Sequence, residues 1–476
     1  MKQKIVSIAI TLLVFFQMAS AQTLVHGGIY NNTTWTLSNS PYLMDGNVVV
    51  FPGITLTIEP GVEVKVKENG LSGTQYYLET RGTLNMVGQP GARITFSADT
   101  ALTTIGSWVG IVVKNSQGGT LNYDYVSISN ALHAVNYDSW IPALIELHQS
   151  EFRYNAYAVN VGTELIASDC IFIGNQDAIF GWSIFTFHNC VFNNNMAALP
   201  IYASSLTINN CSFTNNGLGI ALNSGSVNGI LVKNTLFDSN SIAFDNANNG
   251  LIDSCTFTNN IEALKNTIYL TLRNSNFNNN QTALQLGFGT SVMNCEINDN
   301  ITGIAIGPIG FGQPMPIIEN NRICYNTSYN IDNRTDLNLF IQTNCFCSTD
   351  STLIEAKIFD GYDDISKGLI SYAIFDTSCS TVLAYVNKSP LTGLNEDQDA
   401  DQIELFPNPF VDHINISNSG DYKTYRIITL QGQVLFQGSL NKGMNRINVE
   451  NCPGGIYLLG LIDSADGKHY YKILRN

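Results

Sequence analysis

The middle of the chain alternates apolar and polar residues in short runs, and the alternation recurs with a fixed period. From about residue 150 to 300 a phrase of the form N-C-x-F-x-x-N-x-x-A-Φ, in which Φ is apolar, repeats in steps of 20 to 24 residues. Its aromatic position holds Phe152, Phe172, Phe192, Phe213, Phe237, Phe257, Phe277 and then Ile297. Apolar residues within a repeat alternate, as at Leu206 and Ile208, which is the periodicity of β-strands. A period this short predicts a stacked array of small units.

About twenty residues hold three short strands and three bends, so each repeat predicts one coil, rising one strand spacing of about 4.8 Å. Like residues then lie above like residues. We therefore predict an all-β fold, a right-handed single-stranded parallel β-helix with an interior column of phenylalanines. An asparagine follows each aromatic position by three residues, namely Asn155, Asn175, Asn195, Asn216, Asn240, Asn260, Asn280 and Asn300. Asparagine tolerates left-handed backbone at a tight bend, and its amide can bond to the next coil, so an asparagine ladder is expected.

These repeats resemble the right-handed parallel β-helix family, the architecture of pectate lyases and many surface proteins. Residues 22–125 resemble the first coils of secreted members, with L-T-I-E-P-G-V at residues 56–62. Residues 358–372 resemble the family's last segment, although Cys345 to Ser348 stand where an aromatic-glycine motif is usual. Open ends of a β-helix expose apolar residues and strand edges, so Tyr30 to Tyr42, with Trp35, are expected to cover one end. The β-helix with both caps is expected over residues 22–390.

The N-terminal residues 1–21 have the pattern of a secretory signal peptide. Lys2 and Lys4 precede an apolar run, and Ala19-Ser20-Ala21 forms a small-residue cleavage site. The run is too short for a comfortable membrane span, and no transmembrane segment is expected in the mature chain. The net charge of −15 argues against nucleic acid or an anionic membrane surface as a partner.

The C-terminal part predicts a second domain. Residues 391–402 form an acidic linker, and residues 403–476 contain about seven short alternating strands, which suggests a β-sandwich. Pro407-Asn408-Pro409 opens this segment, Gly455 and Tyr457 lie in a G-G-I-Y-L-L strand, and Lys472 lies in a basic end.

The segment resembles the type A sorting domain of the type IX secretion system. That resemblance implies handling by the type IX machinery and export across an outer membrane to the cell surface or the extracellular space. It also implies removal of the domain and attachment of the remainder to a surface glycolipid. An ordinary carbohydrate-binding or Ig-like sandwich is the alternative.

One column of charged residues is a candidate for catalysis. Lys233, Asp253 and Arg273 occupy the same position on three successive coils, so their side chains are expected to lie next to one another. Polysaccharide lyases of this fold use a Lys or Arg base beside carboxylates, often with calcium. Alternating signs also remove like-charge repulsion along a stack, and we favour that structural role. No two acids stack at one position on adjacent coils, so no glycosidase pair is predicted. Asp397-x-Asp399-x-Asp401 begins like a calcium loop but lacks its glycine and glutamate, so we expect a solvated linker and no cofactor.

Five of the ten cysteines share one position of the repeat with serine and threonine, and free buried thiols are expected there. Cys345, Cys347 and Cys379 lie near the C-terminal cap instead. Export permits a disulfide, and the pair Cys347–Cys379 is expected.

Two functions remain open. The repeat is uniform and does not predict a group of residues with an evident catalytic role. This favours a non-catalytic, adhesin-like module that binds an extracellular glycan or a surface protein. The alternative is a polysaccharide lyase or glycoside hydrolase with its site on one face. Its cleft would lie at the longer coils, near Asn136 to Pro142 or Gly307 to Pro316.

Overall fold

The chain forms two compact units that divide between Thr392 and Gly393, and each is described by itself. The computed structural model describes residues 22–68, 75–99, 104–138, 144–223, 229–310, 312–379, 403–406, 410, 412–418, 422–429, 434–449, 455–463 and 468–475. The expected signal peptide and acidic linker lie outside these residues.

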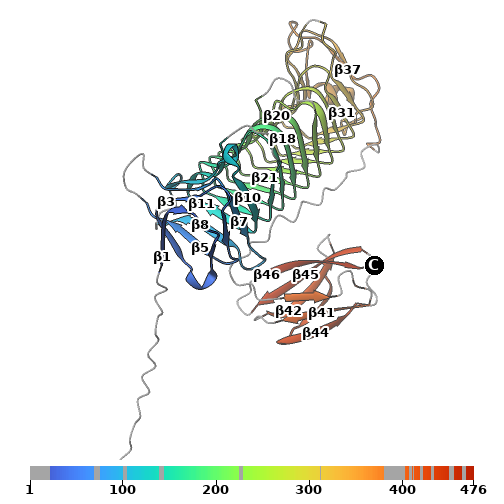
Figure 1. The fold of residues 1–476 in the computed structure, drawn as a ribbon. Coiled ribbons are helices and arrows are strands. Elements are labelled where there is room, and N and C mark those ends of the chain that lie inside the picture. Colours follow the sequence, from blue (N-terminus) through green and yellow to red (C-terminus); the bar gives the residue numbers. More distant parts are fainter. Residues whose placement is uncertain are drawn as a thin grey trace, which may run out of the picture. The chain divides into compact units, whose positions relative to one another are not determined.

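The first unit is a parallel β-solenoid of about 13 turns (Figure 1). Strands of consecutive coils pair in parallel and build three continuous faces. The predicted parallel β-helix is therefore confirmed.

The strands of the three faces have the following bounds. Face 1 consists of β5 (Glu63–Val66), β8 (Ile94–Ala98), β11 (Val126–Ser129), β14 (Glu151–Arg153), β17 (Ile171–Ile173), β19 (Val191–Asn193), β21 (Ser212–Thr214), β24 (Leu236–Asp238), β27 (Thr256–Thr258), β29 (Asn276–Asn278), β32 (Glu296–Asn298) and β35 (Arg322–Cys324). Face 2 consists of β6 (Tyr77–Thr80), β9 (Trp108–Val113), β12 (Ala131–Tyr137), β15 (Tyr157–Val161), β22 (Leu218–Leu222), β25 (Ile242–Asp245), β30 (Thr282–Leu286), β33 (Thr302–Ile306), β36 (Tyr329–Asn333) and β38 (Ile358–Phe359). Face 3 consists of β2 (Thr33–Trp35), β4 (Thr55–Ile58), β7 (Thr83–Val87), β10 (Thr120–Asp124), β13 (Leu144–His148), β16 (Glu164–Ser168), β23 (Ile230–Lys233), β26 (Asn248–Asp253), β31 (Ser291–Met293) and β34 (Ile317–Glu319).

Longer strands continue around a corner. The strands β1 (Thr23–Ile29) and β3 (Tyr42–Val50) run through faces 1 and 2. The strands β18 (Asp177–His188), β20 (Ala197–Asn209) and β28 (Glu262–Arg273) run through faces 2 and 3.

The interior holds the predicted aromatic column behind face 1. Register places Phe172, Phe192 and Phe213 opposite one another, and all three are fully buried. Their ring centroids lie 4.8 Å and 4.6 Å apart with nearly parallel planes. The same stacking continues through Phe277, so the prediction of one column is confirmed.

A second column consists of buried asparagines at the bend after face 1. The amide Nδ2 of Asn216 donates to Oδ1 of Asn240 at 3.0 Å, and Asn240 donates to Asn260 at 3.0 Å. The backbone N–H of Asn216 also donates to Asn240 Oδ1, at 3.0 Å. The second Nδ2 proton of Asn240 reaches the carbonyl of Phe213 at 2.9 Å. Each amide therefore satisfies buried backbone groups of its neighbours, as buried polar groups require.

The backbone at this bend differs from the prediction by one residue. The left-handed conformation belongs to the residue before each asparagine, for example Asn194 (φ 55°) and Asn215 (φ 55°). The buried asparagines themselves have no positive φ. The physical reason is that the amide must point inward to bond to the next coil, and the preceding residue makes the turn.

Short elements complete both ends of the solenoid. At the first coils Trp35 is buried and stacks on Tyr42 at 4.9 Å, near the 3-10 turn η1 (Leu37–Asn39). A second 3-10 turn, η2, covers Asn115–Gln117. The last coils carry helix α1 (Ser351–Glu355) and a small pair of β37 (Leu339–Phe340) with β39 (Ile370–Ser371).

The second unit consists of two antiparallel sheets. One contains β40 (Ile403–Phe406), β41 (His413–Asn418) and β44 (Gly443–Asn448). The other contains β43 (Val434–Ser439), β42 (Tyr422–Thr429), β45 (Gly455–Asp463) and β46 (Lys468–Arg475). Residues from both sheets, including Ile414, Ile427 and Leu459, form one buried cluster. This arrangement agrees with the predicted β-sandwich.

Replacing Asn240 by alanine tests the asparagine column. The change leaves the Asn216 N–H and the Phe213 carbonyl without their partners, so we expect a loss of about 2–4 kcal/mol of unfolding free energy. Chemical denaturation followed by circular dichroism measures it. Asn278→Ala, on the outer side of β29, is the matched control and should change stability by less than about 0.5 kcal/mol. Equal effects of the two substitutions would contradict the role of the column.

Candidate functional site

Partly exposed aromatic rings gather on face 2 over four consecutive coils. They are His133 on β12, Tyr157 on β15, Phe180 and Trp182 on β18, and Tyr202 on β20. We call this group the aromatic strip. His133 stacks on Tyr157 at 4.8 Å, and Trp182 stacks on Tyr202 at 5.7 Å. Phe180 joins the two pairs with edge contacts at 5.8 Å to Tyr157 and 5.4 Å to Trp182.

The strip faces outward because of local strand geometry. Ala158 and Val159 occupy the interior, so Tyr157 before them points away from the core. Trp182 and Tyr202 each follow a column phenylalanine by ten residues and pair in register. Sequence analysis missed the strip, although this shared position in consecutive repeats was a signal that could have found it.

The strip carries little charge at neutral pH. Burial lowers the pKa of His133, which keeps the imidazole neutral, and its Nδ1 has no hydrogen-bond partner among the described residues. Asp177 pairs in register with Tyr157, and burial raises the pKa of its carboxyl. Beside Phe180, the amide of Asn160 donates to Asn136 Oδ1 at 3.1 Å. The arrangement offers ring faces with amide groups at their border.

The candidate catalytic column forms, but two of its three charged residues, Asp253 and Arg273, bond to each other. Register aligns Lys233, Asp253 and Arg273 on face 3. The guanidinium of Arg273 donates to Asp253 Oδ2 at 2.8 Å and 3.1 Å, and Asn274 donates to Oδ1 at 2.9 Å. Partial burial opposes ionisation of Asp253, but these hydrogen bonds outweigh burial and lower its pKa. Lys233 makes no ion pair with a described residue. This geometry favours the structural role.

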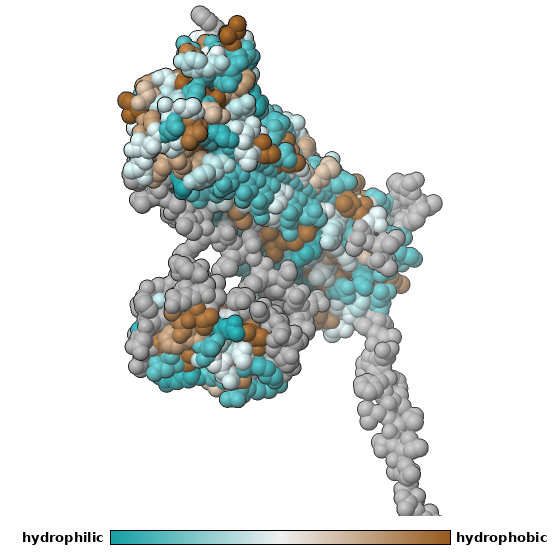
Figure 2. All heavy atoms as spheres, turned by 180° about the vertical axis from the view of Figure 1, so that it is seen from behind, coloured by the Kyte–Doolittle hydropathy of each residue, from teal (hydrophilic) through white to brown (hydrophobic). Residues whose placement is uncertain are grey.

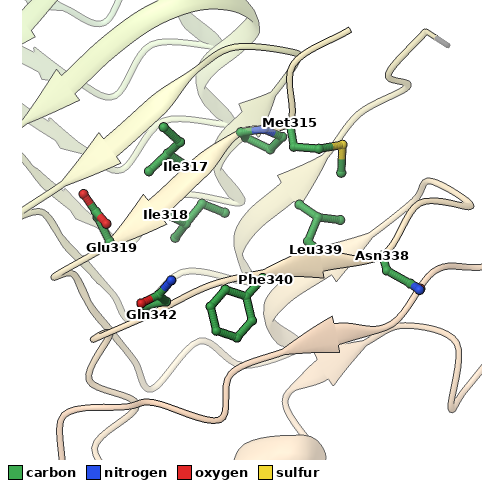
Figure 3. A pocket seen from close by; sticks show the side chains of 9 residues that line it. Met315, Ile317, Ile318, Glu319, Asn338, Leu339, Phe340 and Gln342 are labelled. Atoms are coloured by element: carbon green, nitrogen blue, oxygen red, sulfur yellow. The ribbon is translucent and has the colours of Figure 1, made fainter. Parts of the chain in front are cut away.

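A cavity of about 400 Å³ lies near the C-terminal cap, between β34 and β37 (Figure 3). Ile317 and Phe340 line it with side chains that are 53% and 54% exposed. Glu319 and Gln342 lie at one end and form an isolated bridge, and Asn338 directly precedes β37. Glu319 is the one ionisable side chain among the lining residues, so the cavity does not contain a carboxylate pair.

The cavity lies where a longer coil was predicted to build a cleft. Met315 and Pro316, at the end of the Gly307 to Pro316 segment, line it. At the other longer coil, residues 139–143 lie outside the described part of the chain, as do Asp397, Asp399 and Asp401 of the calcium-like motif.

Two protein families match parts of the chain. Residues 181–308 match the family model of a right handed beta helix region. Residues 404–475 match the model of a secretion system C-terminal sorting domain. A search of curated proteins finds no match. The chain joins a right-handed β-helix region to a type IX sorting domain.

The sorting domain fixes the destination of the protein. Domains of this kind mark proteins that the type IX secretion system delivers to the cell surface or the extracellular space. The presence of this domain implies that the type IX machinery handles the protein. Within the described residues, no helix is long and apolar enough to cross a membrane.

The predicted sorting residues are only partly described. Pro407, Asn408 and Pro409 lie outside the described residues. Gly455 begins β45, Tyr457 on the same strand is buried, and Lys472 lies on β46, which pairs with β45.

The cysteines follow one prediction and contradict another. Cys170, Cys190, Cys211, Cys255 and Cys295 are free and buried, as predicted. Burial raises the pKa of Cys255 and Cys295 to about 12, so these thiols stay protonated.

The expected pair Cys347–Cys379 is wrong, because the disulfides are Cys324–Cys347 and Cys345–Cys379. The reason is that Cys324 lies at the end of β35 on the outer side of face 1, one residue after the interior Ile323, and so reaches Cys347. Sequence spacing could have separated Cys324 from the buried column, because Asn321 holds the column position in this coil and Cys324 follows Ile323 by one residue.

The charged column of face 3 predicts a defined pH dependence. Since the pKa of Asp253 is lowered in the folded chain, its ionisation stabilises the fold above the unfolded pKa of about 4 and less as pH falls through the folded value. Asp253→Asn should therefore lower stability by roughly 1 kcal/mol at neutral pH. Denaturation midpoints from pH 7 to pH 3 should show the difference from the native chain shrinking. A difference that is constant with pH would contradict this role.

Proposed function

We propose that the β-helix region is a non-catalytic module that binds glycans outside the cell through the aromatic strip. The observation that supports this proposal is the set of five outward-facing rings on consecutive coils of face 2. Rings on four coils extend over about 14 Å of the solenoid axis, at one strand spacing per coil. A rigid solenoid holds these rings at fixed spacing, so little conformational freedom is lost on binding.

A glycan fits the surroundings of the strip better than a protein partner. Stable protein interfaces bury at least about 1,200 Å² with an apolar centre, whereas the face of the solenoid seen in Figure 2 is largely hydrophilic with separate apolar patches. Aromatic rings cover the apolar faces of sugar rings, and neighbouring amides bond to hydroxyls. Asn136 and Asn160 supply such amides beside Phe180.

Catalysis by this region is the second candidate, and the charges of the described sites give it less support. A glycosidase needs two carboxyl groups roughly 5–9.5 Å apart across the substrate. The cavity near Phe340 has Glu319 alone among its lining residues. A lyase needs a base beside several carboxylates. The guanidinium of Arg273 is bonded to Asp253, and the in-register neighbours of Lys233 are Asn209 and the single carboxylate of Asp253.

The double substitution Trp182→Ala with Tyr202→Ala tests the proposal. We expect the mature chain to bind a subset of a glycan array, and the variant to bind those glycans at least about tenfold more weakly, because stacked rings at a binding centre contribute most of the affinity. Titration calorimetry with the array hits measures the change.

Tyr325→Ala is the matched control, since this tyrosine is 63% exposed and lies outside the strip. It should leave affinity unchanged. Full affinity in the double variant would contradict the role of the strip. New reducing ends or unsaturated products on incubation with the hits would establish the enzymatic alternative instead.

A further inference from the structure

Four cysteines of the C-terminal cap bring their sulfur atoms together. Cys324 ends β35, and Cys345 lies beside the same strand in a bridge with Arg322. Cys347 and Cys379 lie in left-handed turns, with φ of 54° and 52°. Cys379 is the last described residue before residues 380–402. We call these four residues the sulfur cluster.

Each sulfur atom lies close to more than its bonded partner. Cys347 is bonded to Cys324, yet its Sγ lies 3.8 Å from Cys345 Sγ and 3.9 Å from Cys379 Sγ. The Sγ atoms of Cys324, Cys345 and Cys347 all lie within 4.8 Å of one another. Cα separations of the bonded pairs are 5.7 Å and 5.1 Å. A second pairing is therefore within reach of side-chain rotation.

The surroundings of Cys347 favour its release as a thiolate. The Nε of Arg322 donates to Cys347 Sγ at 3.4 Å, and a guanidinium beside sulfur stabilises negative charge. Cys347 and Cys379 are also partly exposed, whereas Cys324 and Cys345 are buried. An external thiol therefore has access to one end of each disulfide.

We propose that the sulfur cluster is a thiol–disulfide exchange site, at which an external thiol interconverts two pairings. The first is Cys324–Cys347 with Cys345–Cys379, and the second is Cys324–Cys345 with Cys347–Cys379. The site is independent of the aromatic strip and of glycan binding.

The exchange proceeds without net oxidation. An external thiolate attacks Cys379 Sγ, forms a mixed disulfide and releases the Cys345 thiolate. That thiolate attacks Cys324 Sγ, and the Cys347 thiolate leaves beside Arg322. Cys347 then attacks Cys379 Sγ and releases the external thiolate unchanged. The final pairing has the same number of disulfides as the first.

The pairing determines which cysteine forms the disulfide with Cys379, at the end of the described part of the solenoid. In the first arrangement Cys379 is bonded to Cys345, and in the second to Cys347. Both keep the cap crosslinked, as an exported protein in an oxidising compartment permits. The exchange changes the disulfide partner of Cys379, the residue before 380–402, and leaves the coils intact.

Disulfide mapping of the full mature chain tests the proposal. The native protein is incubated with reduced and oxidised glutathione in one arm and with reduced thioredoxin in the other. It is then quenched in acid, digested with pepsin and analysed by mass spectrometry. Cleavage at Phe346 separates Cys345 from Cys347. We expect the second pairing to appear with an added thiol and to stay absent without one. Exchange with thioredoxin alone would identify a protein dithiol as the partner.

Two substitutions sharpen the test. Cys379→Ser leaves Cys345 as a free thiol beside the Cys324–Cys347 bond, so pairing should scramble with no added thiol. Cys170→Ser in the buried column is the control and should keep the native pairing. Arg322→Gln should slow exchange about threefold, because a leaving thiol that is less acidic by about one unit leaves more slowly, and Arg322→Lys should restore most of the rate.

Two results would overturn the proposal. One is a single pairing that persists in both thiol arms and in Cys379→Ser. The other is four free thiols with one bound zinc ion per chain in the native protein, measured by thiol titration and elemental analysis. Repeating the mapping in a Cys452→Ser background removes the cysteine of the second unit as an internal source of thiol.

Discussion

The fold depends on one buried amide that recurs in every regular coil. At the bend after face 1 the backbone leaves the pairing of the sheets, and its N–H and C=O groups would be buried without partners. Asn240 illustrates the solution, since its side chain bonds to groups of the coil before it and of the coil after it. A buried unpaired group costs about 1–3 kcal/mol, so every coil has to place the same amide at the same height. The stacked phenylalanines follow from this constraint, because the position three residues earlier is then fixed as well.

An interior fixed in this way leaves the exterior free to vary. Outward positions of one coil contact the same positions of its neighbours, so any residue type can extend into a column without disturbing the core. On face 3 the column of Asp253 and Arg273 is an ion pair, whereas on face 2 the column of Trp182 and Tyr202 is a stack of rings. The chemistry of the protein therefore lies in short outer columns, and each uses a scaffold that the interior makes rigid.

Much of the fold could be predicted from the sequence, and the site could not. The period of 20 to 24 residues and the phenylalanine position predicted the parallel coils and the interior column. The conformation of the bend was predicted one residue too late, because in coils such as Asn194-Asn195 both residues tolerate left-handed backbone and the sequence does not say which one adopts it. The disulfides were mispaired because Cys324 was not counted with the cap cysteines, although strand alternation places it on the outer side after Ile323; which outer cysteine it meets depends on the path of the cap, which has no repeat. Trp182 and Tyr202 share one repeat position and could have been found from the sequence, whereas His133, Tyr157 and Phe180 lie at other positions and only the fold brings them to these two rings.

The two ends of the solenoid have different physical problems, and the chain solves them differently. Most contacts join residues about one coil apart in sequence, so coils can form one after another once a first coil is in place. The first coils are covered by packing, with Trp35 buried against Tyr42. The last coils adjoin the segment that leads to the sorting domain, and a terminal coil there lacks a neighbour on one side. The Cys324–Cys347 bond ties these coils to β35, and the Cys345–Cys379 bond closes a second loop, so an opened end has less conformational freedom to gain. This arrangement keeps the outer columns in register through the last described coils of the solenoid.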